Sequence, residues 1–283
     1  MSYDDPALAA DLPHGPAPAR LVTARFAVIT AATFCYFLSM GALIPTLPRY
    51  VEDELGGDGI AVGIVVGAFA VTAALARPWA GRLGDLRGRR ILVMGGAGIM
   101  GLSVLAYSLT DAIAPLIGLR LVSGIGEAAM FVGAATAIQD LAPDDRRGEA
   151  ASYFSVALYA GLAFGPALGE RLAHDHGFHT VWIAAGISAL VAAVLGVWTP
   201  RRSGPPAAKP DRLLHPAAIG PGFVLLLGLI PFTGFATFLS LYGKEIGLRD
   251  VGPVFFGYAG IVLLIRMFGA RLPDRLGWKV ASS

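Results

Sequence analysis

Gly81-Arg82-Leu83-Gly84-Asp85-Leu86-Arg87-Gly88-Arg89-Arg90 is a basic stretch, interrupted by glycines, that directly follows a long apolar segment. A weaker copy, Ala270-Arg271-Leu272-Pro273-Asp274-Arg275-Leu276-Gly277-Trp278-Lys279, follows another apolar segment near the end of the chain. Aligning the two copies places Asp85 opposite Asp274. A repeat of this kind between apolar segments predicts a duplicated bundle of membrane helices.

The composition indicates that the main solvent of this protein is a lipid bilayer. Hydrophobic residues make up 55% of the 283 residues, charged residues 15%, and the mean hydropathy is +0.65. A soluble domain carries about 25% charged residues. The net charge of +2 is too small to indicate a nucleic-acid partner. The single cysteine, Cys35, excludes an internal disulfide.

Eight apolar segments approach the length of about 20 residues that a helix needs to cross a bilayer. Lipid cannot satisfy unpaired backbone groups, so the segments must be helices, and the fold class is an all-α integral membrane protein. The predicted spans are Phe26–Leu47, Ile60–Trp79, Ile91–Leu109, Ile113–Ile138, Ala150–Leu172, Thr180–Trp198, Ala217–Leu241 and Gly252–Phe268.

The distribution of basic residues predicts the orientation. With the N-terminus inside, 17 of the 22 lysines and arginines fall in inner segments. The outer loops hold only Arg49, Arg171, Lys244 and Arg249, and Arg120 lies within a span. The positive-inside rule therefore favours a multi-pass protein of the inner or plasma membrane with a cytoplasmic N-terminus.

Composition also divides the chain. Residues 1–25 begin with a polar, proline-rich stretch and are predicted to be a disordered cytoplasmic tail. Residues 26–198 hold six spans, and residues 199–216, which contain five prolines, read as a cytoplasmic linker. Residues 217–283 hold the remaining two spans and are predicted to be an incomplete second half.

Six spans, a basic linker and a restarting repeat resemble the major facilitator superfamily, whose members have twelve or more helices in two similar halves. The stretch 81–90 fills every specified position of the family signature G-x-L-x-D-x-x-G-R-R/K. The resemblance implies that Gly81, Asp85, Gly88, Arg89 and Arg90 form a conformational latch between the halves. The alternative is that the basic residues only fix the topology. The resemblance also implies four missing helices, so we expect a C-terminally truncated sequence.

The fourth span carries Arg120, Ser123 and Glu127 in a pattern that resembles the family motif R-x-x-x-G-x-G-x-A. Seven residues bring Arg120 and Glu127 within about 20° of one face, about 10.5 Å apart along the axis. Ionisable groups in mid-span are costly and usually face a cavity. We expect Arg120 to couple protons or contact an anion, and Glu127 to be its titratable partner. A structural charge pair that holds helices together is the alternative.

The fifth span carries Gly161, Gly165 and Gly169, a stripe suited to close helix contact, with Pro166 bending the helix. The pattern G-x-x-x-G-P-x-x-G resembles a motif of drug/proton antiporters, although Glu170 stands where another glycine is usual. Ordinary helix packing is the alternative interpretation.

Four further residues are candidates for lining a substrate cavity: Tyr36 and Ser39 on the first span, and Phe235 and Phe238 on the seventh. Lipid contact or internal packing explains them equally well. Three histidines surround Asp175, but we expect no metal site because nothing in the sequence makes their side chains converge.

These features predict a secondary active transporter that exports a drug or small metabolite by proton antiport. Its partners would be a small-molecule substrate, protons and the lipid bilayer, with the proton gradient as energy source and no cofactor. No phosphate-binding loop and no nucleophile–base pair is apparent, so neither ATP-driven transport nor an enzyme is expected. The alternatives are an uptake symporter or sugar permease of the same fold, and a truncated membrane protein that does not transport.

Overall fold

The structure is a computed structural model of the chain, and it describes residues 21–201, 219–248 and 251–269. All regular structure within these residues is helical, which confirms the predicted all-α fold. Most of the predicted N-terminal tail, most of the linker and the second copy of the basic stretch lie outside the described residues.

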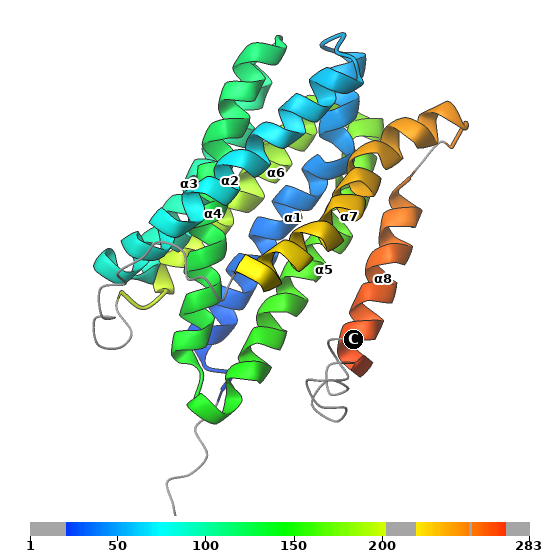
Figure 1. The fold of residues 1–283 in the computed structure, drawn as a ribbon. Helices are drawn as coiled ribbons and strands as arrows, with labels where there is room; N and C mark the ends of the chain where they lie inside the picture. Colours follow the sequence, from blue (N-terminus) through cyan, green and yellow to red (C-terminus); the bar gives the residue numbers. More distant parts are fainter. Residues whose placement is uncertain (1–20, 202–218, 249–250, 270–283) are drawn as a thin grey trace, which may run out of the picture.

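The described residues contain eight α-helices, one at each predicted span (Figure 1). The six helices of the first half, counted with their adjoining 3₁₀ turns, are long and apolar enough to cross a membrane. The α-helices are α1 Ala24–Asp53, α2 Gly59–Arg87, α3 Arg89–Ala106, α4 Ile113–Leu141, α5 Arg147–His176, α6 Phe178–Leu195, α7 Ile219–Glu245 and α8 Gly252–Gly269. The 3₁₀ turns are η1 Tyr107–Leu109, η2 Asp144–Arg146 and η3 Gly196–Trp198.

Local sequence signals set several helix ends. The Thr23 hydroxyl accepts a hydrogen bond from the Phe26 amide at 3.3 Å and caps α1. The Asp58 carboxylate does the same for α2, accepting from the Ala61 amide at 2.9 Å. Gly88, with φ of +90°, separates α2 from α3, because glycine adopts such a backbone conformation without steric cost.

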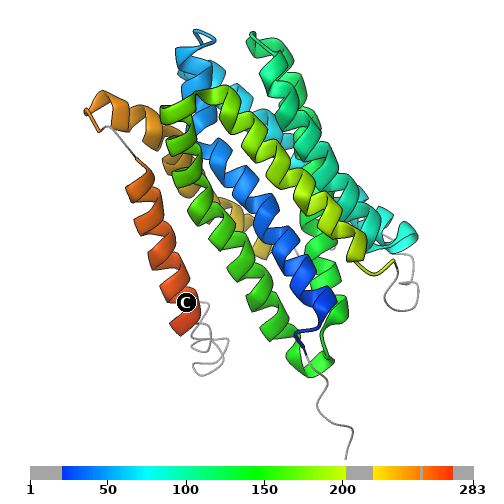
Figure 2. The same cartoon turned by 180° about the vertical axis from the view of Figure 1, so that it is seen from behind.

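The six helices of the first half form a bundle in which α1 packs on α5 and α6, while α4 packs on α2 and α3 (Figures 1 and 2). The α3–α6 pair joins the two groups. Glycines let the backbones approach closely at these contacts. A Cβ built on Gly126 of α4 would lie only 2.7 Å from the carbonyl oxygen of Gly96 on α3.

The helix connections alternate between the two ends of the bundle. The beginning of α1, the α2–α3 turn and the α4–α5 turn lie at one end, and the other turns of this half lie opposite (Figure 1). The beginning of α3 and the end of α7 also lie at opposite ends (Figure 1). This is the alternation that the basic residues predict.

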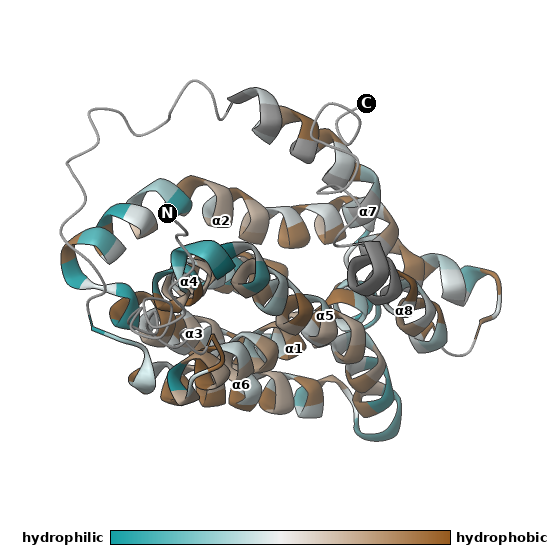
Figure 3. Cartoon of the chain, turned by 90° about the horizontal axis from the view of Figure 1, so that it is seen from below, coloured by the Kyte–Doolittle hydropathy of each residue, from teal (hydrophilic) through white to brown (hydrophobic). Residues whose placement is uncertain are grey.

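Apolar residues lie along the outside of the helices as well as at their contacts (Figure 3). On α2, for example, Val71 is 55% exposed and Leu75 62%. Lipid tails solvate such side chains without cost, whereas water does not. Of the second half, α7 lies against α1 and α8 lies against α5, where the rings of Phe164 and Phe256 meet edge to face at 5.6 Å.

Candidate functional site

A buried carboxylate lies between α2 and α4. The Glu127 side chain is only 5% exposed, and its Oε1 lies 3.2 Å from Nη2 of Arg77 on α2. The Arg77 guanidinium also lies over the ring of Phe131, 4.8 Å from the ring centroid. Arg77 itself is 47% exposed, so the pair joins a buried acid to a base that reaches the surface.

Arg120 has a different environment on the same helix. It is buried, its Nε donates to the Val65 carbonyl at 3.2 Å, and its guanidinium lies 4.3 Å from the centroid of the Phe69 ring. Arg120 and Glu127 therefore both contact α2, at two levels, and the structure does not pair them with each other. The axial rise between them, about 10.5 Å, is too large for direct contact.

Buried hydroxyl groups lie on α4 and on segments that pack beside it. Ser123 donates to the Arg120 carbonyl at 3.0 Å and lies 3.4 Å from the hydroxyl of Tyr107. Tyr36 and Ser39 of α1 are buried, and among the described residues neither side chain has a hydrogen-bond partner. Tyr36 lies within electrostatic range of Glu127 and Arg120, so the first and fourth helices share this polar region.

An apolar cavity of about 240 Å³ lies between α1, α2, α4, α5 and α7, and Arg120 is its charged lining residue. None of the four predicted lining residues borders it: Tyr36 and Ser39 are buried beside it on α1, and α7 contributes Thr233 and Thr237 instead. The aromatic pattern of α7 did not indicate these two threonines.

The two predicted aromatic residues of α7 contact other neighbours. The Phe235 ring packs against Phe255 and Tyr258 of α8, with centroids 6.4 and 6.1 Å apart. Phe238 borders a separate open pocket together with Glu52 near the end of α1.

The predicted latch residues gather at the α2–α3 turn. Arg89 bonds Asp85 at 2.7 Å and Asp140, near the end of α4, at 3.2 Å, while Arg90 donates to the Thr199 carbonyl at 2.9 Å. These contacts tie four helix ends together. The sequence did not reveal Asp140 or Thr199, because nothing in the chain itself shows that their helix ends meet this turn.

The two glycines of the latch differ in their surroundings. A Cβ on Gly88 would overlap the carbonyl oxygen of Arg201, whereas one on Gly81 would meet nothing within 4 Å. Of these two positions, only position 88 therefore requires a glycine for steric reasons.

The glycine stripe of α5 faces α1. A Cβ on Gly165 would lie 2.6 Å from the Cα of Gly41, and one on Gly161 would lie 2.7 Å from the Leu38 amide nitrogen. Gly169 lies against the Ala42 backbone in the same way. A Cβ built on Gly41 would lie 3.1 Å from Cδ of Pro166. In the described structure the stripe is a helix contact that brings α1 and α5 backbone to backbone.

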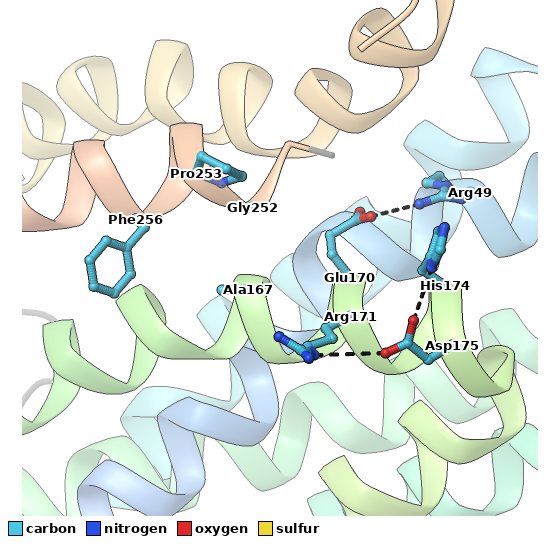
Figure 4. Close-up of a pocket in the computed structure, with 9 residues that line it drawn as sticks. All are labelled: Arg49, Ala167, Glu170, Arg171, His174, Asp175, Gly252, Pro253 and Phe256. Atoms are coloured by element: carbon cyan, nitrogen blue, oxygen red, sulfur yellow. Dashed lines mark hydrogen bonds and ion pairs between the residues drawn. The ribbon is translucent and has the colours of Figure 1, made fainter. Parts of the chain in front are cut away.

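An open pocket of about 620 Å³ lies at the other end of the bundle, between α1, α5 and the beginning of α8 (Figure 4). Its charges pair with each other. Glu170 bonds Arg49 at 2.7 Å, and Asp175 contacts both His174 and Arg171 (Figure 4). Within the described ranges no group of three metal-ligating side chains converges.

Glu170 differs from what its sequence position suggests. Its side chain is only 6% exposed, although it lies near the end of a membrane helix. The last turns of α1 bring Arg49 against it, and the two side chains form an ion pair.

Comparison with known proteins agrees with this arrangement. The family model of the Major Facilitator Superfamily matches residues 29–282. The chain is 30% identical over 257 residues to Multidrug resistance protein 1 of Bacillus subtilis (strain 168), and 27% identical over 241 residues to Quinolone resistance protein NorA of Staphylococcus aureus (strain MRSA252). The matches cover 87% and 79% of this chain, and 62% of each relative.

Solved structures share the fold at low sequence identity. A bacterial homologue of the human lysosomal transporter Spinster, in an inward-facing and occupied conformation, superposes with a TM-score of 0.69 at 17% identity, covering 90% of this chain and 61% of that one. The human organic anion transporter MFSD10 gives a TM-score of 0.66 at 19% identity, covering 87% and 71%. The family match over nearly the whole chain and the shared helical architecture show that this chain belongs to the Major Facilitator Superfamily.

Proposed function

We propose that this chain works in a secondary active transporter that exports a drug or small metabolite in exchange for protons. The observation that carries the proposal is the buried carboxylate of Glu127, which Arg77 of α2 holds. Glu127 lies on α4, the helix that also presents Arg120 to the cavity. Ionisable groups inside a membrane bundle are costly, and proton relays are among the functions that retain them. The relatives named for multidrug and quinolone resistance support export rather than uptake.

The Arg77–Glu127 pair provides a way to couple protons to movement. The ionised carboxylate attracts Arg77 and holds α2 against α4. A proton on Glu127 removes that attraction, and the half-exposed Arg77 is then free to reorient. Because protonation stabilises one arrangement of the two helices over the other, it shifts the population between conformations.

The substrate would bind in the cavity beside Arg120, between the first half and α7. Rocking of the halves about such a site exposes it to each side in turn. The contacts of Arg89 and Arg90 lie at one end of the first half, where they would hold the α2–α3 turn in the position from which it acts as a latch toward the second half.

The proposal includes a location. A chain with these apolar helices would lie in the plasma membrane, or inner membrane, of a bacterium. The distribution of its basic residues supports a cytoplasmic N-terminus and a cytoplasmic α2–α3 turn. The latch is then a cytoplasmic device, and the Arg49–Glu170 pair is external.

The test is transport by the reconstituted protein in vesicles carrying an imposed pH gradient, with a fluoroquinolone as probe. We expect the gradient to drive fluoroquinolone and protons in opposite directions. Glu127→Gln should reduce gradient-driven movement to background while leaving exchange of labelled for unlabelled drug intact. Glu149→Gln, which removes an exposed carboxylate at the beginning of α5, is the matched control.

Each outcome of this test has a separate meaning. Undiminished proton-coupled movement in Glu127→Gln would remove that residue from the mechanism. Protons and drug moving together would replace antiport by uptake symport. No movement of this or any other drug by the unmodified protein would favour the interpretation of a membrane protein that does not transport.

A further inference from the structure

The lining of the cavity beside Arg120 is mostly apolar and carries one positive charge. Its wall consists of apolar side chains such as Met40, Phe69 and Leu162, with two threonines on the α7 side. Arg120 is the one charged group among the described residues that line it. A ligand in this cavity therefore meets mostly apolar surface, two threonines and a single cation.

Arg120 differs in its partners from three other arginines of the first half. Arg49, Arg77 and Arg89 each have a carboxylate partner, Glu170, Glu127 and Asp85 respectively. Within the part of the chain that the structure describes, Arg120 has no carboxylate within 4 Å, and its guanidinium makes one hydrogen bond, from Nε to the Val65 carbonyl.

The charge of Arg120 is permanent. A guanidinium does not lose its proton in proteins, so this side chain cannot relieve the cost of burial by becoming neutral. A buried charge without a counterion is unfavourable, and contact with the Phe69 ring compensates only part of that cost. An anion that enters the cavity would supply the missing partner through the outer edge of the guanidinium, which is shaped for a carboxylate or sulfonate.

The neighbouring charged side chains do not oppose the binding of such an anion. The nearest acid along α4 is Glu127, about 10.5 Å away along the axis. Its charge is already balanced by Arg77. The bound anion would therefore meet no unbalanced negative charge from α2 or α4.

We infer that this cavity selects small aromatic anions, with the ring against the apolar wall and a single carboxylate or sulfonate paired with Arg120. The volume of about 240 Å³ lies below the range of about 300–1,000 Å³ that holds most drug-sized ligands. A one- or two-ring acid is therefore the expected occupant rather than a two-chain lipid. This inference names the substrate class of the proposed transporter and rests on that function only for its biological meaning.

The experiment compares two probes that share a ring system and differ in charge. The anion is 1-naphthylacetate and the cation is 1-naphthylmethylammonium, each titrated into the purified protein in nanodiscs of phosphatidylcholine without any gradient. We expect the unmodified protein to bind the anion at least tenfold more tightly than the cation. Equal binding of the two probes, or preference for the cation, would overturn the inference.

Variants locate the selectivity. Arg120→Gln should weaken binding of 1-naphthylacetate by roughly tenfold to a hundredfold, the range of one charge-assisted contact, and leave the cation unchanged. Arg120→Lys should keep part of the preference. Arg171→Gln, which removes an arginine that is 84% exposed and lies outside the cavity, is the matched control and should change neither affinity. Anion affinity that survives Arg120→Gln unchanged would refute the role of Arg120.

A second variant covers the case in which Arg120→Gln does not fold. Thr237→Asp leaves Arg120 in place and adds a carboxylate to the opposite wall of the same cavity. It should lower the affinity for the anion and raise that for the cation, and unchanged affinities for both would count against the proposal. Because binding is measured without a gradient, anion-selective binding without transport would refute the proposed function alone. Transport of drugs without anion-selective binding would refute this inference alone.

Discussion

At the scale of single residues, the turn between α2 and α3 depends on the absence of a side chain at Gly88. Its φ of +90° and ψ of 160° define a backbone region that is essentially restricted to glycine. The Arg201 carbonyl also occupies the space that a Cβ would need. Gly81 belongs to the same predicted latch but has a helical backbone and open space around it.

Gly88→Ala should therefore lower the free energy of unfolding by about 1–3 kcal/mol, the usual cost of holding a side chain in such a conformation. Gly81→Ala should leave it unchanged or raise it slightly, since alanine favours a helix. Unfolding by sodium dodecyl sulfate in mixed micelles measures both variants. Equal stability of the two would show that the turn at position 88 relaxes without cost.

Residues also mark the limit of what the sequence predicted. Their spacing put Arg120 and Glu127 about 10.5 Å apart along the helix axis, and in the structure each finds its partners on α2. Their actual contacts, with Val65 and Phe69 in one case and Arg77 in the other, depend on how α2 lies along α4. The count of basic residues had placed Arg77 among those that fix the topology, because an arginine near the end of a span looks the same in sequence whether it faces lipid headgroups or a buried acid.

At the scale of helices, the α1–α5 contact is the clearest case of a sequence pattern with a geometric explanation. Three glycines four residues apart on α5 make one stripe, and Gly41 on α1 lies against it. Without a strong hydrophobic force between helices in lipid, such close backbone contact supplies much of the packing energy. The same stripe would suit any tight helix pair, so packing alone does not distinguish an antiporter.

Gly165→Ala should destabilise the protein by roughly 1–3 kcal/mol, because the added methyl group would lie 2.6 Å from the Cα of Gly41, and a backbone atom cannot move aside as a side chain can. Gly67→Ala on α2 is the matched control, since a Cβ there meets nothing within 4 Å. That change should raise stability by about 0.5–1 kcal/mol through helix propensity. The same unfolding assay compares them, and a neutral Gly165→Ala would mean that α1 and α5 separate freely.

At the scale of the whole molecule, the helix contacts of the first half have an internal symmetry. Exchanging helices 1, 2 and 3 with 4, 5 and 6 turns the α1–α5 pair into α4–α2 and the α3–α4 pair into α6–α1, and all four pairs are present. The α3–α6 pair maps onto itself. Because α1 and α4 enter from opposite ends, the two triplets are inverted repeats, an arrangement found in many transporters.

The sequence predicted the helices well because hydrophobic length is a local property. It also indicated the repeat between the halves, because the basic stretch recurs. It could not predict which helices touch, and so it missed the partners of Glu127 and Arg89 and the burial of Glu170. The inverted relation between the two triplets is likewise visible only in the contacts.

The contact pattern implies that the first six helices are stable without the last two. The strong interfaces all lie among α1 to α6, whereas α7 and α8 are attached chiefly through α1 and α5. A chain that ends after Arg201 keeps every one of those interfaces and the bond from Arg90 to Thr199. It should insert into membranes and unfold in a single cooperative transition, followed by circular dichroism in detergent.

The matched control is a chain that ends after Gly177 and so lacks α6. It loses the α3–α6 and α1–α6 contacts and leaves the largest buried side chain of the bundle, Trp182, out of the core. We expect this shorter chain to lose the cooperative transition, because the second triplet of helices is then incomplete and the α3–α6 pair that joins the two groups is missing. Two results would contradict this interpretation: a cooperative transition in the chain that ends after Gly177, or no cooperative transition in the chain that ends after Arg201. In either case the first six helices would not be a cooperative folding unit.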